Sequence, residues 1–103
     1  MSGYSLTASA QRDFLAVRDY YLREAGYRIA RQMTAEFVAA FRTIAMNPDI
    51  GDKREDLAEN RPILFWPMRD YLILYRTTRA SVVIVMITRG TRDIARLIQR
   101  REP

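Results

Sequence analysis

The chain has 103 residues, of which 49% are hydrophobic, so it is long enough for one domain with its own core. It contains neither cysteine nor histidine, which excludes disulfides and thiolate metal sites and removes the usual general base near neutral pH. Its net charge of +5 comes from 16 arginines and the single Lys53 against 12 acidic residues. This balance favours an acidic partner or nucleic acid, although the codon bias of a GC-rich genome would also enrich arginine.

No targeting or membrane segment is visible. The first residues show no basic start followed by an apolar run, and no apolar stretch reaches the ~20 residues that span a bilayer. We therefore expect a cytoplasmic protein that forms a single domain over residues 1–103 and makes no membrane contact.

The front half predicts a short extended segment and two helices. Tyr4–Thr7 is extended, and Thr7 has the side chain of a helix N-cap. Gly26 ends the first helix, and Asn47-Pro48 closes the second because the residue before proline leaves the helical region. So short a joint predicts an antiparallel hairpin. Its apolar positions recur at helical spacing: Ala10, Phe14, Val17, Tyr21, Ala30, Met33, Phe37, Ala40, Phe41 and Ile44.

The back half predicts three strands and a last helix. Asp49–Pro62 is polar and reads as a loop with one helical turn at most. The strands are Ile63–Pro67, Asp70–Arg76 and Ser81–Thr88, and their short links allow only antiparallel hairpins. Thr91 starts the terminal helix, with Asp93 in its first turn. The order is β-α-α-β-β-β-α, an α+β fold in which the helical hairpin packs on a small antiparallel sheet.

Four motifs in this order carry a resemblance to a known family. They are "YSLTASAQRDF" (4–14), "NPDIGDKREDL" (47–57), "FWPMRDYLILYR" (65–76) and "VVIVMITRGTRD" (82–93). Together they resemble the ParE branch of the RelE/ParE toxin superfamily. Where that branch often has histidine before the glycine, this chain has Arg89, so a role specific to histidine does not carry over.

The resemblance implies the toxin component of a type II toxin–antitoxin system. A cognate ParD-like antitoxin would neutralise it in a hetero-oligomer and would supply the DNA-binding domain, so we expect no sequence-specific DNA binding by this chain. ParE-type toxins poison DNA gyrase, whereas RelE-type toxins cleave messenger RNA in the ribosome. The ribosome-dependent endoribonuclease is the alternative function.

The residue types favour binding over catalysis. A nuclease could draw on Arg61, Arg76, Arg89 and Tyr71, but arginine holds its protons at a pKa above 12 and cannot act as a base. Tyr71 and Tyr75 also alternate on one strand face, which is typical of an aromatic core. We expect no cofactor and no metal, because neither ligand sets nor phosphate-binding loops are present.

A row of arginines marks the carboxy-terminal segment. Arg89, Arg92, Arg96 and Arg100 recur at helical spacing, opposite an apolar strip of Ile94, Leu97 and Ile98 that docks the helix. We expect the row, with Trp66 and Tyr75, to contact the antitoxin or the target, beside an apolar and arginine-lined groove. A solvated helix face is the alternative reading of the row.

Overall fold

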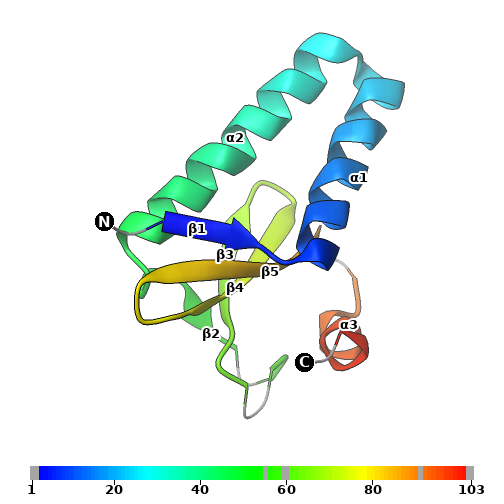
Figure 1. Ribbon diagram of the computed structural model, residues 1–103. Coiled ribbons are helices and arrows are strands. Elements are labelled where there is room, and N and C mark those ends of the chain that lie inside the picture. The colour runs from blue at the N-terminus through cyan, green and yellow to red at the C-terminus, as the bar shows by residue number, and fades with distance from the viewer. Residues whose placement is uncertain (1–2, 55, 59–60, 91, 102–103) are drawn as a thin grey trace.

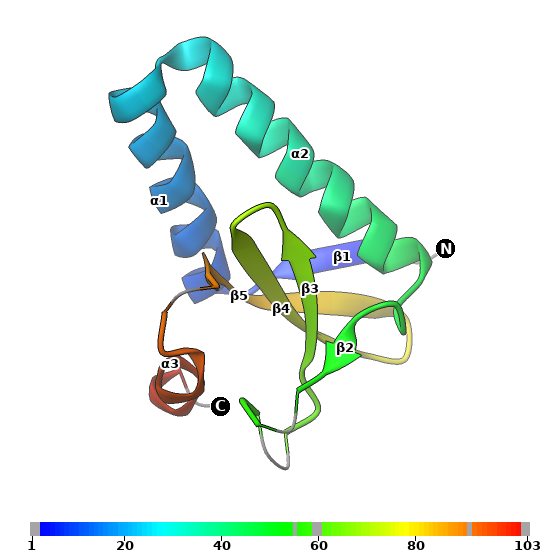
Figure 2. The same cartoon turned by 180° about the vertical axis from the view of Figure 1, so that it is seen from behind.

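The computed structural model describes residues 3–54, 56–58, 61–90 and 92–101 (Figure 1). Its strands and helices are, in chain order, β1 (Gly3–Leu6), α1 (Ala8–Ala25), α2 (Tyr27–Met46), β2 (Asp52–Lys53), β3 (Leu64–Met68), β4 (Tyr71–Thr77), β5 (Ser81–Arg89) and α3 (Ile94–Arg100). The helical hairpin lies on one side of the sheet and α3 on the other (Figures 1 and 2).

The two long helices begin and end where the sequence predicts. The Thr7 hydroxyl oxygen accepts a hydrogen bond from the Ala10 amide at 3.1 Å, which caps α1. Gly26 separates the helices with a φ of 88°, in the left-handed region that glycine adopts at little steric cost. Asn47 follows the last residue of α2. The predicted hairpin is confirmed.

The sheet is mixed, which differs from the small antiparallel sheet we expected. Its strand order is β1-β5-β4-β3-β2. Strand β1 pairs parallel with β5, from Gly3 opposite Ser81 to Leu6 opposite Ile84, and the expected loop contains the two-residue strand β2. The α+β class and the order of the remaining elements are confirmed. Pro67 lies in β3 beyond the reach of β2, at the edge position that its missing amide requires.

An extra residue interrupts the pairing of β4 and β5. Leu74 lies opposite Met86 while Tyr75 lies opposite Ile84, so Val85 has no partner on β4. Such a bulge changes the alternation of side chains along a strand. Ile84 accordingly faces the helical hairpin, whereas Val85 and Met86 both face α3.

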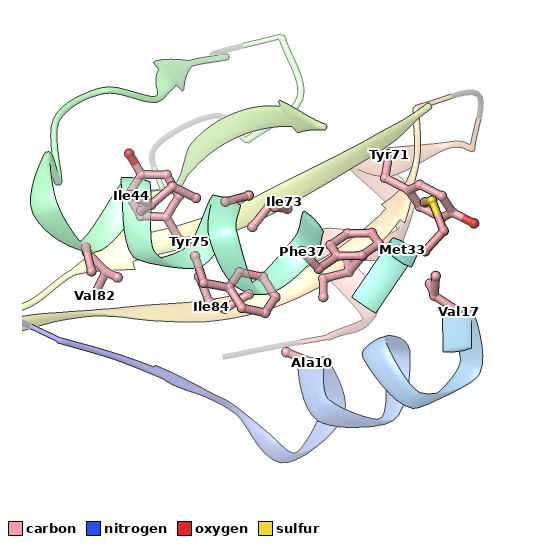
Figure 3. Packing of buried hydrophobic residues seen from close by; sticks show 14 residues of the cluster. Ala10, Val17, Met33, Phe37, Ile44, Tyr71, Ile73, Tyr75, Val82 and Ile84 are labelled. Atoms are coloured by element: carbon pink, nitrogen blue, oxygen red, sulfur yellow. The ribbon is translucent and has the colours of Figure 1, made fainter. Parts of the chain in front are cut away.

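The main core lies between the hairpin and the sheet. Phe37 and Ile44 of α2 point toward Ile73 and Tyr75 of β4 (Figure 3), and all four are fully buried. Each such side chain stabilises the fold by about 1.5–3 kcal/mol through burial alone. This core fixes one face of the sheet against the hairpin and leaves the other face for α3.

A smaller core forms under α3. Ile94 and Ile98 pack against Phe65, Leu74 and Met86, with Leu97 half-buried beside them. The predicted apolar strip is therefore confirmed. The helix starts later than expected: Asp93 is its N-cap and accepts from the Arg96 amide at 3.3 Å. Thr91, where we expected the start, lies outside the described residues.

Candidate partner-binding groove

A groove of about 400 Å³ opens between β4, β5 and the carboxy-terminal end of α3. Its floor is apolar, and three arginines stand among its lining residues, which are Thr7, Ser9, Arg61, Pro62, Ile63, Leu74, Arg76, Val85, Met86, Ile98 and Arg101. The apolar and arginine-lined groove that the sequence led us to expect is thus present. We call this set of residues the groove.

The pairing of β4 and β5 determines which of their side chains line the groove. Leu74 and Arg76 are two residues apart on β4, so they project from the same face and place an arginine at the end of the apolar floor. The bulge at Val85 brings Val85 and Met86 onto this face together. Arg61 enters from the segment that precedes β3.

The third arginine is held by α1. The Arg101 guanidinium donates to the Asp13 carboxylate at 2.6 and 3.2 Å and to the Val85 carbonyl at 3.1 Å. The same carboxylate accepts from the Ile87 amide at 3.0 Å. Because β1 ends opposite Ile84, no strand among the described residues neighbours this part of β5 on that side. We call these contacts the Asp13–Arg101 clamp; it fixes the end of α3 against the sheet.

The predicted arginine row is divided in the structure. Arg92, Arg96 and Arg100 are exposed and line one shallow surface with Asp93 and Leu97, which we call the α3 ledge. Arg89 does not join them, because residue 89 is the last of β5 and not part of the helix. Its guanidinium lies 5.3 Å from the Tyr20 ring centre and 5.0 Å from that of Tyr71, a cation–π geometry on the hairpin side of the sheet.

The four residues that a nuclease could use lie on opposite faces of the sheet. Arg61 and Arg76 line the groove, whereas Arg89 and Tyr71 lie against the hairpin. Tyr71 is 5% exposed, and burial together with its neighbour Tyr21 raises the pKa of its hydroxyl above the ordinary value. The structure does not bring these four side chains into one site.

The two aromatic residues predicted to contact a partner also lie away from the arginines of α3. Trp66 is half-buried and packs on the main core. Tyr75 is fully buried, and its hydroxyl donates to the Pro48 carbonyl at 2.7 Å and accepts from the Gly51 amide at 2.9 Å. Tyr75 therefore offers no surface to a partner in this conformation, and it does not line the groove.

Arg101 is the one groove arginine that is not among the site residues predicted from the sequence. Its neighbour Arg100 belonged to the outward row, but Arg101 follows Leu97 by four residues and Ile98 by three. That spacing places it on the docked side of α3. The sequence therefore held a signal for Arg101; the carboxylate that receives it, 88 positions away in the chain, was not visible.

The groove combines apolar, hydroxyl and guanidinium side chains. None of its described lining residues carries a carboxylate, phenol or amine. No group of three or more potential metal ligands occurs among the described residues. No helix in the described part of the chain is long and apolar enough to cross a membrane.

A helical hairpin therefore covers one face of the mixed sheet, and an arginine-lined groove opens on the other. The family model described as "ParE toxin of type II toxin-antitoxin system, parDE" matches residues 4–94, and the chain belongs to this family. A solved structure titled "Chromosomal ParDE TA system from P. aeruginosa" shares the fold, with a TM-score of 0.72 and 19% identity over 86% of this chain and 96% of that chain. A search of curated proteins found no match.

Proposed function

We propose that a cognate ParD-like antitoxin neutralises this ParE-family toxin by laying an amphipathic, acidic segment into the groove. The observation that supports this most directly is the pairing of an apolar floor with arginines at its margin. An amphipathic segment buries its apolar side chains on such a floor and places carboxylates against guanidinium groups. The α3 ledge extends the basic surface beside it.

The target that we propose is DNA gyrase, which the toxin would hold by binding rather than by a reaction on substrate. The resemblance to ParE toxins supports this choice. The residues support it too, because Tyr71, the phenol among the four nuclease candidates, lies on the opposite face of the sheet from the groove that Arg61 and Arg76 line. The ribosome-dependent nuclease remains the alternative.

The antitoxin proposal is tested with the product of the gene beside this one. Arg76→Glu/Arg96→Glu should weaken the complex about tenfold or more in low salt, and the loss should shrink as salt rises. The matched control is Arg28→Glu/Arg79→Glu, which makes the same charge change at two exposed arginines outside the groove and the α3 ledge. Equal effects of the two pairs would contradict the proposed contact.

The target proposal is tested by expressing the intact chain in bacteria. A gyrase poison should cause double-strand breaks, a DNA-damage response and filamentous cells while bulk translation continues early on. Early arrest of protein synthesis with cleaved messenger RNA and intact DNA would contradict it and favour the nuclease.

A further inference from the structure

A second hollow lies beside the groove, between the start of α1 and the end of α3. Its volume is about 420 Å³, and it is lined by Ser9, Arg12, Asp13, Arg100 and Arg101. Three of these five side chains are guanidinium groups, and the only acidic residue among them is Asp13. We call it the α1–α3 hollow.

The charge of the α1–α3 hollow is not balanced internally. Both carboxylate oxygens of Asp13 are bound to Arg101, whose charge they neutralise. Arg12 and Arg100 are exposed and have no hydrogen-bond or ion-pair partner within the described part of the chain. The four charged residues therefore leave a surplus of two positive charges, from three arginines and one aspartate.

The hollow joins the surfaces already described. Arg101 lines both the groove and the α1–α3 hollow, and Arg100 lines both this hollow and the α3 ledge. A bound peptide that leaves the groove past Arg101 thus meets Arg12 and Arg100 next, and then Arg96. The basic surface runs around the end of α3 and does not stop at the groove.

The lining favours an acidic peptide over a nucleic acid strand. Single-stranded nucleic acid is bound by cations together with aromatic side chains on which its bases stack. No described residue lining the groove, the α1–α3 hollow or the α3 ledge is aromatic. Paired guanidinium groups without a stacking platform suit the carboxylates of aspartate and glutamate.

We propose that the α1–α3 hollow is a second acidic-peptide site, in which Arg12 and Arg100 bind carboxylates of the segment that continues from the groove. This inference rests on the proposed antitoxin contact and extends it to Arg12, which lies on α1. Recognition is then bipartite, with apolar contact in the groove and carboxylate contact in the hollow.

The test measures binding of fluorescent decaglutamate to the full chain and its variants in salt of about 0.05 M, where exposed charges are weakly screened. Arg12→Glu/Arg100→Glu should weaken binding about tenfold relative to Arg28→Glu/Arg79→Glu. The two pairs carry the same change of net charge, so the comparison removes the effect of overall charge. Circular dichroism of each variant checks that the fold is kept.

Three outcomes overturn the inference. Equal decaglutamate binding by the two variant pairs contradicts a peptide site in the α1–α3 hollow. Tighter binding of an oligothymidylate of the same length, lost in Arg12→Glu/Arg100→Glu, assigns the hollow to nucleic acid. Decaglutamate binding that falls in Arg76→Glu/Arg96→Glu but not in Arg12→Glu/Arg100→Glu removes the second site and leaves the proposed antitoxin contact standing. Failure of the antitoxin itself to bind the unaltered chain is a separate result that contradicts the proposed function.

Discussion

The Asp13–Arg101 clamp gives the sharpest stability prediction. Asp13→Ala removes the acceptor of both Arg101 nitrogens and of the Ile87 amide. The two side chains are only 19% and 28% exposed, so water replaces these bonds incompletely. Hydrogen bonds to charged groups are worth roughly 1.5–3 kcal/mol, and we expect a net loss of about 2 kcal/mol. For a domain of this size that lowers Tm by about 8–16 °C.

A matched control is available on the same helix. Asp19 pairs with Arg18 at 2.9 Å, but their side chains are 53% and 47% exposed. Asp19→Ala should therefore change the free energy of unfolding by less than about 0.5 kcal/mol after solvent screening. Both substitutions replace aspartate by alanine within α1, so the change in helix propensity cancels between them.

Thermal unfolding followed by circular dichroism measures both variants, and limited proteolysis reports whether the end of α3 is released first. A double-mutant cycle of Asp13→Ala and Arg101→Ala should give a coupling energy of about 1–2 kcal/mol between Asp13 and Arg101. If Asp13→Ala and Asp19→Ala unfold at the same temperature, the clamp does not hold α3, and the groove wall formed by Arg101 is not fixed as we infer.

Three further predictions concern the loop after α2 and the tie between α2 and the β3–β4 turn. Tyr75→Phe should lower the free energy of unfolding in urea by about 1–2 kcal/mol, because the Pro48 carbonyl and the Gly51 amide lose their partner; an unchanged midpoint would contradict this. Gly51→Ala should destabilise by about 1–3 kcal/mol, because an added Cβ would lie 2.7 Å from the Tyr75 hydroxyl oxygen; a fully stable variant in the same titration would refute it. Hydrogen bonds, first from Arg69 and then from Gln32, lower the pKa of Glu36 from 4.5 to about 2. The ionised Glu36 carboxylate should therefore stabilise the folded state fully above pH 4.5, and this stabilisation should be lost as pH falls toward 2. The difference in free energy of unfolding between the unaltered chain and Glu36→Gln is small for so exposed a pair, and it should shrink over that pH range.

Much of the fold is determined by local sequence. The limits of the two long helices follow from residues that act on their own backbone: the Thr7 cap, the left-handed Gly26 and the Asn47-Pro48 pair. The side-chain alternation on β4 also follows from the sequence, because apolar residues two positions apart must share a face. These features depend on neighbours within a few positions, which a single sequence displays.

The motif over residues 47–57 illustrates an intermediate case. The sequence predicted a loop here, and the motif that carries the resemblance contains Pro48 and Gly51. The structure supplies the reason: the hydroxyl of Tyr75 bonds both residues from across the core, and no Cβ fits at Gly51. The pattern was visible in the chain, but its cause lies 24 positions away.

Only the tertiary structure decided how the candidate site is composed. The sequence gives no local signal for the parallel pairing of β1 with β5 or for the bulge at Val85, because both depend on strands distant in the chain. The bulge brings Val85 and Met86 to the groove, and Asp13 of α1 brings Arg101 there. The end of β5 carries Arg89 to the hairpin side, away from the row that its spacing had predicted. Helical spacing shows which residues share a face only within one helix. The residue at which a helix begins after a strand and a turn depends on what each element packs against.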